Sequence, residues 1–294
     1  MYQCLSMESE NQGVLVSVLM TAFNREQYIQ DAIESVLAST YKNFELIIVD
    51  DCSIDRTVAI ARKYETLDPR VKVFENKVNL GDYPNRNKAA GYASGKYLKY
   101  VDGDDLIYPW GLEILVNSME KFDRAGWGLC SINQDEFHIY PFLLKKEDVF
   151  NYNFNFNNLF HRASLSSIIK REVFEELGGF SGKRHLGDFE MWLRLSLQYD
   201  VVLMPHGIVW HRIHDMQESV SNRSNEYVPL KYDISLFKFL SYRDLNVEVE
   251  TWNREIRKLR VIIFKKLLKF FIFFKWNLIH KVIVEIKKDI ETFS

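Results

Sequence analysis

Apolar runs typical of buried strands alternate with helical patterns along the first half of the chain, and several of these runs end abruptly in carboxylates. The runs VLVSVLM (14–20), FELIIVDD (44–51) and KYLKYVD (96–102) are nearly continuously apolar, as strands covered on both faces are. Apolar residues recur with a helical period over 29–37, with Asn24 as the expected N-cap. Strands that alternate with helices predict an α/β fold with a mainly parallel sheet flanked by helices.

Two acidic strand ends mark the edge of the sheet where a ligand is expected. Asp50 and Asp51 close one run, and Asp102, Asp104 and Asp105 close another. Ligands of open parallel sheets bind beyond the carboxyl ends of the strands. Carboxylates this close raise one another's pKa unless a positive charge lies between them. The pattern therefore predicts a Mg²⁺ or Mn²⁺ site that bridges carboxylates to phosphates, with solvated loop carboxylates as the plain alternative.

Three longer stretches resemble one known family. They are the segments 14–61, 79–105 (NLGDYPNRNKAAGYASGKYLKYVDGDD) and 178–196 (GGFSGKRHLGDFEMWLRLS). Together they resemble the family-2 inverting nucleotide-sugar glycosyltransferases of GT-A fold, over roughly residues 14 to 221. Each motif alone is loose, but their order and spacing are specific. The resemblance implies a Rossmann-like GT-A sheet and a sugar transfer from a nucleotide donor.

The resemblance also assigns residues to the donor nucleotide. Thr21 and Asn24 hold the positions that line the nucleotide pocket in the family. Asp50 and Asp51 correspond to the acids that contact base and ribose, and Asp51 is the better match for a uracil or ribose contact. Arg86 holds the basic position of the NRNKA stretch, with a charge on a helix surface as its alternative.

The DGD sequence at 102–104 matches the DxD motif of the family. The resemblance implies that Asp104 is the main ligand of Mn²⁺ or Mg²⁺, and that Asp102 binds the donor ribose or a metal-bound water. It also places His214, with Arg212, near the diphosphate and the metal. A zinc site built from nearby histidines is disfavoured, because His211 and His214 would point to opposite faces of an extended strand.

An inverting transfer needs one carboxylate that accepts the proton of the acceptor hydroxyl. The resemblance assigns this role to Asp188, just before the WLRL helix. Family members usually have Glu–Asp at this point, whereas this chain has Gly187 before Asp188. Any acceptor contact made by the usual Glu therefore has no counterpart in this sequence. A helix N-cap is the structural alternative for Asp188.

The C-terminal part differs in charge from the rest. Residues 254–288 carry eleven Lys and Arg against two Glu, a net charge of +9, which leaves −11 for the remainder of a chain whose total is −2. An acidic body argues against a nucleic-acid footprint, and a basic tail favours an anionic partner such as a membrane surface. A single helix would place polar residues on one arc of roughly 120°, as an in-plane interfacial helix does; these are Lys265, Lys266, Lys269, Asn277 and His280. Packing on the body or on a second chain is the alternative.

These patterns predict a domain plan. Residues 1–13 form a flexible N-terminus, 14–225 a GT-A domain with a nucleotide-binding half (14–132) and an acceptor half (133–225), and 226–294 a helical extension. Within the acceptor half, NYNFNFNNLFH is expected to be irregular. The N-terminus has no apolar signal core, and three widely spaced cysteines make no disulfide framework. We therefore expect a cytoplasmic enzyme, peripheral on the inner face of the membrane.

The expected function is that of an inverting, metal-dependent hexosyltransferase. It would move a sugar from a nucleotide donor, a UDP-sugar first, to a saccharide or lipid-linked saccharide in bacterial-type surface polysaccharide synthesis. A degenerate nucleotide-binding scaffold is the non-enzyme alternative. A HAD-like phosphatase would need its DxD motif in the first strand, and a sugar nucleotidyltransferase would need a glycine- and arginine-rich first loop where TAFNREQ stands. Oligomerisation stays open.

Overall fold

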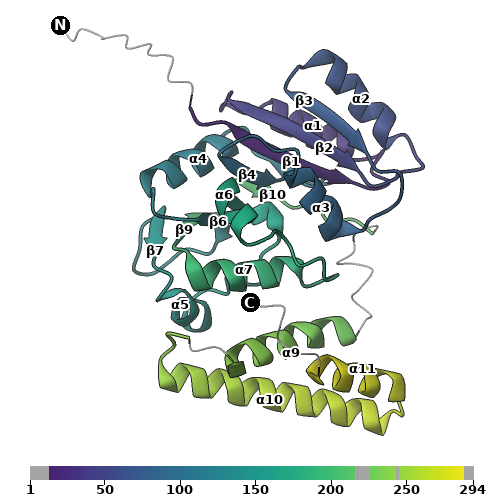
Figure 1. The fold of residues 1–294 in the computed structure, drawn as a ribbon. Helices are drawn as coiled ribbons and strands as arrows, with labels where there is room; N and C mark the ends of the chain where they lie inside the picture. The colour runs from purple at the N-terminus through teal and green to yellow at the C-terminus, as the bar shows by residue number, and fades with distance from the viewer. Residues whose placement is uncertain (1–12, 216, 218–225, 243–244, 288–294) are drawn as a thin grey trace, which may run out of the picture.

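A computed structural model describes residues 13–215, 217, 226–242 and 245–287. The expected flexible N-terminus therefore lies almost wholly outside the described residues. Figure 1 shows an α/β body and, beneath it, a layer of C-terminal helices, so that α10 lies at the far end of the molecule from strands β1 to β3.

One mixed sheet of eight strands organises the body, in the order β3-β2-β1-β4-β8-β6-β9-β7. Strands β3, β2, β1 and β4 are parallel, as are β6 and β9, while β8 and β7 run antiparallel to their neighbours. The strands are β1 (Val16–Ala22), β2 (Phe44–Asp50), β3 (Val71–Glu75), β4 (Tyr97–Tyr100), β6 (Trp127–Ile132), β7 (Phe142–Leu144), β8 (Ser167–Lys170) and β9 (Val201–Pro205). A small antiparallel pair is formed by β5 (Leu106–Ile107) and β10 (Val209–Trp210).

Helices cover both faces of the sheet because successive strand residues point to opposite sides. Val18 and Met20 of β1 pack in one apolar cluster, and Leu19 between them packs in the other. The first cluster is covered by α1 (Ile29–Leu37), α2 (Thr57–Leu67) and α4 (Gly111–Lys121). The second is covered by α3 (Asp82–Ala90), α5 (Val149–Asn155), α6 (Arg171–Glu176) and α7 (Gly187–Gln198). The predicted α/β class with a mainly parallel sheet is confirmed.

Two local expectations are wrong. The segment NYNFNFNNLFH is not irregular throughout, because α5 covers its first part and buries Phe150 and Tyr152 against the body. Asn24 is not an N-cap: α1 begins at Ile29, and Asn24 has a left-handed backbone with φ of 52°. Its side-chain oxygen instead accepts a hydrogen bond of 3.0 Å from the N–H of Ile54.

The C-terminal extension is a group of three helices, namely α9 (Tyr227–Tyr242), α10 (Val249–Ile272) and α11 (Trp276–Lys287). The chain turns at Phe274, whose φ is 54°, so the expected single polar arc from Lys265 to His280 does not exist. Ile256 and Leu259 of α10 join the apolar cluster of the body, which makes part of the extension a packing layer. Among the described helices, none has the length and apolar character needed to cross a membrane.

Candidate active site

A cleft of about 800 Å³ opens at the carboxyl ends of β1, β2 and β4. The ends of these strands are tied together: the N–H of Asp51 donates to the carbonyl of Ala22 (2.8 Å), and the N–H of Gly103 donates to the carbonyl of Thr21 (3.0 Å). Most residues that the sequence assigned to the donor line this cleft: Thr21, Asn24, Asp51, Arg86, Asp102 and Asp104. The topology therefore brings together side chains that lie up to 83 positions apart in the chain.

Each carboxylate of the DxD motif is paired with an arginine. Asp104 Oδ2 accepts from Arg25 Nε at 2.8 Å and lies 3.0 Å from His214 Nε2. Asp102 accepts from Thr21 Oγ1 at 3.0 Å and from Arg86 Nη2 at 2.7 Å. Burial alone would raise the pKa of Asp102, but Arg86 beside it lowers that pKa overall.

Asp105 next to the motif is in a different electrostatic state. It is buried, and burial together with the negative charges of Asp102 and Asp104 raises its pKa to about 8. Its carboxylate accepts one hydrogen bond of 3.0 Å from the N–H of Arg212. Arg212 Nε also donates to the carbonyl of Asp104 at 3.0 Å, so Arg212 fastens the segment after β10 to the motif.

Arg86 lies inside the site. Only 6% of its surface is exposed, and its guanidinium bonds to both Asp82 (2.7 Å) and Asp102 (2.7 Å). The guanidinium also lies over the Tyr100 ring, 5.6 Å from its centroid. Its Nη1 has no hydrogen-bond partner among the residues that the structure describes. The alternative interpretation of Arg86 as a charge on a helix surface is therefore wrong.

Asp51 is held in place by three neighbouring donors. It accepts from Asn76 Nδ2 at 2.7 Å and from the backbone N–H groups of Leu80 and Gly81, both at 2.8 Å. These bonds fix the segment that enters α3 against the end of β2. Asp51 thereby shapes one wall of the cleft.

Asp50 is not among the residues that line the cleft. Its carboxylate accepts from the N–H of Ser53 at 2.8 Å and from the hydroxyl of Ser53 at 2.5 Å. Burial raises the pKa of Asp50, which these two bonds partly oppose. The structure thus places Asp50 in the turn after β2, where it holds the backbone.

Asp188 lies in the first turn of α7, one residue beyond the helix start, and the N-cap position belongs to Leu186. Its Oδ2 accepts from the N–H of Ser164 at 3.2 Å, while its buried Oδ1 has no partner within the described part of the chain. Burial raises the pKa of Asp188 to about 7; the positive charge of Arg86 opposes this rise, and the nearby acids Asp82 and Asp102 add to it.

Asp104 and His214 provide two adjacent positions that suit a hard divalent cation. Their facing atoms are 3.0 Å apart, which is about the separation of neighbouring ligands in an octahedron with bonds of roughly 2.1 Å. In the described residues, no group of three or more His, Cys, Asp and Glu side chains is arranged to hold a metal. The two residues fit Mg²⁺ or Mn²⁺ because such ions take their remaining ligands from phosphates and water.

Two details near this position were not predicted. β10 ends at Trp210, so His211 and His214 do not lie on an extended strand, and His211 lines the cleft. Sequence reasoning also missed Arg25, whose bond to Asp104 spans 79 positions. The only available signal was its place directly after the TAFN stretch that ends β1.

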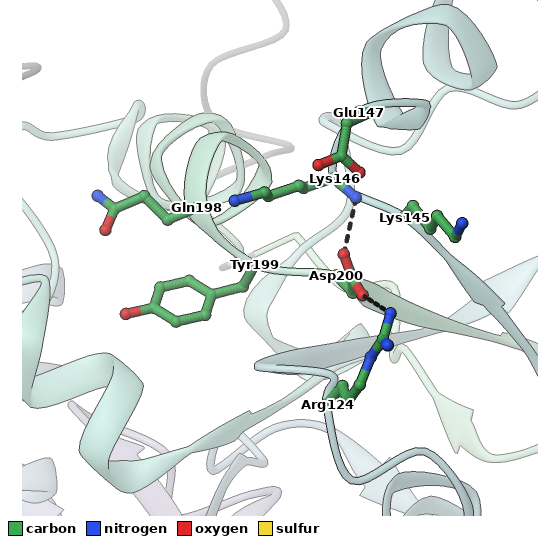
Figure 2. A pocket seen from close by; sticks show the side chains of 7 residues that line it. All are labelled: Arg124, Lys145, Lys146, Glu147, Gln198, Tyr199 and Asp200. Carbon is green, nitrogen blue, oxygen red and sulfur yellow. Dashed lines mark hydrogen bonds and ion pairs between the residues drawn. The ribbon is translucent and has the colours of Figure 1, made fainter.

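A second hollow, of about 460 Å³, lies at the other end of α7 (Figure 2). Asp200 there accepts from the N–H of Lys146 at 3.0 Å and lies 3.9 Å from Arg124. Gln198 and Asp188 are ten residues apart on α7, which corresponds to about 15 Å along a helix. The hollow contains none of the predicted site residues, so the cleft at the strand ends remains the candidate site.

Comparison with known sequences gives consistent matches. A sequence model described as Glycosyl transferase family 2 matches residues 17–178. An uncharacterized glycosyltransferase of Haemophilus influenzae is 31% identical over 217 residues, which cover 70% of this chain and 67% of that protein. The UDP-Glc:alpha-D-GlcNAc-diphosphoundecaprenol beta-1,3-glucosyltransferase WfgD of Escherichia coli is 28% identical over 222 residues, covering 74% of this chain and 83% of that protein.

Solved structures share the fold. TarS (residues 1–349) of S. aureus in complex with UDP-GlcNAc superposes with a TM-score of 0.63 at 17% identity, covering 87% of this chain and 73% of that one. The mannosyltransferase PcManGT of Pyrobaculum calidifontis, in complex with GDP-Man and Mn²⁺, gives a TM-score of 0.57 at 16% identity, covering 78% and 64%. These likenesses confirm the predicted GT-A arrangement of sheet and helices.

Proposed function

The chain belongs to glycosyl transferase family 2, and from this premise we propose that it transfers a hexosyl group, with inversion, from a UDP-sugar to a lipid-linked saccharide. The observation that carries the proposal is the cleft in which the DxD carboxylates are paired with Arg25, Arg86 and His214. The family assignment removes the phosphatase and nucleotidyltransferase alternatives. Two of the similar proteins support the donor and the acceptor class. WfgD is named for UDP-Glc and a diphosphoundecaprenol acceptor, and TarS was solved in complex with UDP-GlcNAc.

The donor nucleotide would bind between Asp51 and Arg86. A carboxylate has about four acceptor positions, and three of those on Asp51 are occupied by the protein. The remaining position suits the imide N–H of uracil. Thr21 and Asn24 would line the same pocket, and Asp102, already oriented by Thr21 and Arg86, would accept from a ribose hydroxyl.

Asp104 and His214 would hold Mn²⁺ or Mg²⁺, with Asp102 adjacent to them. A cation bound there would offset the negative charge that develops on the leaving diphosphate. Arg25 already donates to the same oxygen of Asp104 and lines the cleft, so it can also contact a phosphate oxygen.

Asp188 would be the base. In the transfer, the acceptor oxygen bonds to the anomeric carbon, the bond from that carbon to the diphosphate oxygen breaks, and the hydroxyl proton moves to Asp188. The N–H of Ser164 holds Oδ2, which leaves Oδ1, buried and without a partner among the described residues, to accept the proton. A pKa of about 7 suits this task, because about half of the carboxyl groups are then ionised at neutral pH and each is still basic enough to accept a proton.

The C-terminal helices would bring the enzyme to the inner face of the membrane, where a lipid-linked acceptor is found. α10 buries Ile256 and Leu259 against the body and Ile263 among the C-terminal helices, while another face exposes apolar residues at helical spacing; these are Val261, Phe264, Leu268 and Phe271. The exposed basic residues Arg257 and Lys265 lie beside this face. Apolar side chains flanked by positive charge suit an anionic lipid surface.

Titration calorimetry with UDP, GDP and dTDP, each with Mn²⁺ and with EDTA, tests the donor proposal. We expect metal-dependent binding of UDP in preference to the other two. Absence of binding by all three nucleotides would contradict the donor proposal, whereas binding without any sugar transfer would favour the scaffold alternative. Transfer of a labelled sugar from UDP-glucose or UDP-GlcNAc to a short-chain GlcNAc-diphosphate lipid then tests the acceptor class.

Vesicle sedimentation tests the membrane proposal. The double variant Phe264→Ser/Leu268→Ser should lose binding to phosphatidylglycerol vesicles and retain UDP binding. Ile139→Ser is the matched control, because Ile139 is also exposed and apolar but lies on the body. Equal vesicle binding by the double variant and the native protein would contradict the assignment of this face.

A further inference from the structure

The residue before the proposed base is a glycine that no backbone requirement explains. Gly187 is the first residue of α7, and its φ lies outside the left-handed region. Glycine is a poor helix former, so its presence at a helix start calls for another reason. The reason is space: a Cβ on Gly187 would lie 2.4 Å from both Cδ1 and Cε1 of Tyr83, well inside the contact distance of about 3.5–4.0 Å for carbon atoms.

Tyr83 is held firmly in this position. It lies on α3 with only 5% of its surface exposed, yet it contributes to the wall of the cleft. Its ring packs against Phe180 with centroids 5.3 Å apart, and Phe180 in turn packs edge-on against Tyr100 at 5.5 Å. Hydrogen bonds in both directions between Phe180 and Asn87 of α3 lock this aromatic group to the helix. The ring therefore cannot move aside cheaply to admit a side chain at 187.

The same ring reaches the base. Burial raises the pKa of the Tyr83 hydroxyl and the negative charge of Asp188 raises it further, while a hydrogen bond from the backbone of Asp188 opposes this rise. Tyr83 and Arg86 are three residues apart on α3 and so lie on one side of that helix. Tyr83 packs against the residue before Asp188, and Arg86 acts on Asp188 by its charge, as Asp82 and Asp102 also do.

We infer that Tyr83 is a positioning residue for the base: its ring fills the space that a side chain at 187 would take and holds the first turn of α7, with Asp188, in place. In place of a side chain before the base, this chain has an aromatic ring supplied by another helix. The inference rests on the proposed role of Asp188, and it goes beyond that role by naming the group that fixes the base and keeps water from it.

The inference is tested by adding a methyl group at position 187 and by removing the aromatic ring at position 83. The measurement is UDP release from UDP-glucose and UDP-GlcNAc with Mn²⁺, with water as acceptor. Gly187→Ala should lower kcat about 100-fold, as expected for a displaced catalytic group, with a smaller change in KM for the donor. Tyr83→Ala/Gly187→Ala should recover most of this loss, since the ring no longer opposes the new methyl group. Tyr83→Phe/Gly187→Ala keeps the ring and should stay as slow as Gly187→Ala.

A pH profile separates positioning from simple packing. Tyr83→Ala admits water to Asp188, so the acidic limb of kcat/KM should move to lower pH, and Tyr83→Phe should shift it much less. Gly128→Ala is the matched control for a crowded glycine: its Cβ would lie 2.6 Å from the Met204 methyl in the core, so it should lower Tm and leave the acidic limb in place.

The outcomes separate the inference from the function on which it rests. Native kcat in Gly187→Ala, or no recovery in Tyr83→Ala/Gly187→Ala, overturns the positioning role of Tyr83. Native UDP release and transfer in Asp188→Asn instead overturns the base itself, whatever the exchange at 83 and 187 shows. Recovery of kcat together with a shifted acidic limb supports the inference.

Discussion

The two acidic strand ends of this protein look alike in sequence and differ in what holds them. After β2, Asp50 and Asp51 accept hydrogen bonds from neutral donors: Ser53, Asn76 and backbone N–H groups. After β4, the carboxylates of the DxD motif are held by charged or chargeable side chains; these are Arg25, Arg86 and His214. The first end, Asp50 and Asp51, is a joint that fixes neighbouring backbone segments. The second end, Asp102 and Asp104, is an electrostatic site whose charge a ligand can share.

The difference teaches how to separate structural from functional carboxylates. A carboxylate that accepts hydrogen bonds from backbone N–H groups fixes the backbone there, and these bonds take up its negative charge. Charged or chargeable side chains brought from distant parts of the chain, such as Arg25 and His214 on Asp104, are positioned by the fold around a charge that a ligand can share. The charge of the partners is the distinguishing feature, and their separation in sequence is not: Arg86 lies only 16 positions from Asp102, whereas Leu80 lies 29 positions from Asp51.

Removal of the Asp104 carboxylate should have the largest effect on UDP binding and kcat. Asp104→Ala takes away the acceptor shared by Arg25 and His214 and leaves these groups without their counter-charge. We expect a loss of metal-dependent UDP binding and a fall of at least about 100-fold in kcat, as for other groups that stabilise developing charge. Calorimetry with Mn²⁺ and UDP-release kinetics measure both. UDP binding that is as tight and as metal-dependent as in the native protein would show that Asp104 is not the ligand.

The pH profile of kcat/KM tests whether the charged site after β4 also influences the pKa of Asp188 on α7. Asp188 must be ionised to accept a proton, and burial raises its pKa to about 7. Below pH 7 kcat/KM should therefore fall, approaching about tenfold per pH unit, and above pH 7 it should level off. Because the charge of Arg86 opposes the rise in this pKa, Arg86→Gln should move the acidic limb to higher pH. A limb that stays in place would mean that Arg86 and Asp188 are not coupled.

Asp51→Asn probes the joint where it meets the cleft. An amide accepts hydrogen bonds through its oxygen, and its NH2 group cannot accept from Asn76, Leu80 or Gly81. One or more buried donors would therefore lose their partner. We expect the free energy of unfolding to fall by about 1–3 kcal/mol, with UDP binding weakened through the displaced loop. Chemical denaturation and calorimetry on the same variant measure the two effects. Unchanged stability with UDP binding lost would mean that Asp51 contacts the nucleotide but does not fix the loop.

The sheet could be predicted from the sequence because continuous apolar runs leave few alternatives for a strand buried on both faces. The run at 44–51 gave β2 to within one residue, for example. α5 was missed because alternating Asn and aromatic residues hide the helical period that buries Phe150 and Tyr152. The residues around the DxD motif could be named through resemblance, but the bond from Arg25 to Asp104 and the contact of Tyr83 with Gly187 depend on packing between distant segments.

Asp50→Ala is the mildest change and the sharpest test of the comparison. Asp50 stands beside Asp51 in sequence, but its carboxylate serves only the turn at Ser53 and does not line the cleft. Its removal should lower Tm through the loss of two local hydrogen bonds, while UDP affinity in the presence of Mn²⁺ stays close to the native value. Thermal unfolding with and without UDP distinguishes these effects, because a ligand that still binds raises Tm by the same increment in both proteins. If the increment disappeared in Asp50→Ala, the end of β2 would belong to the donor site as a whole, and the division between joint and electrostatic site would fail.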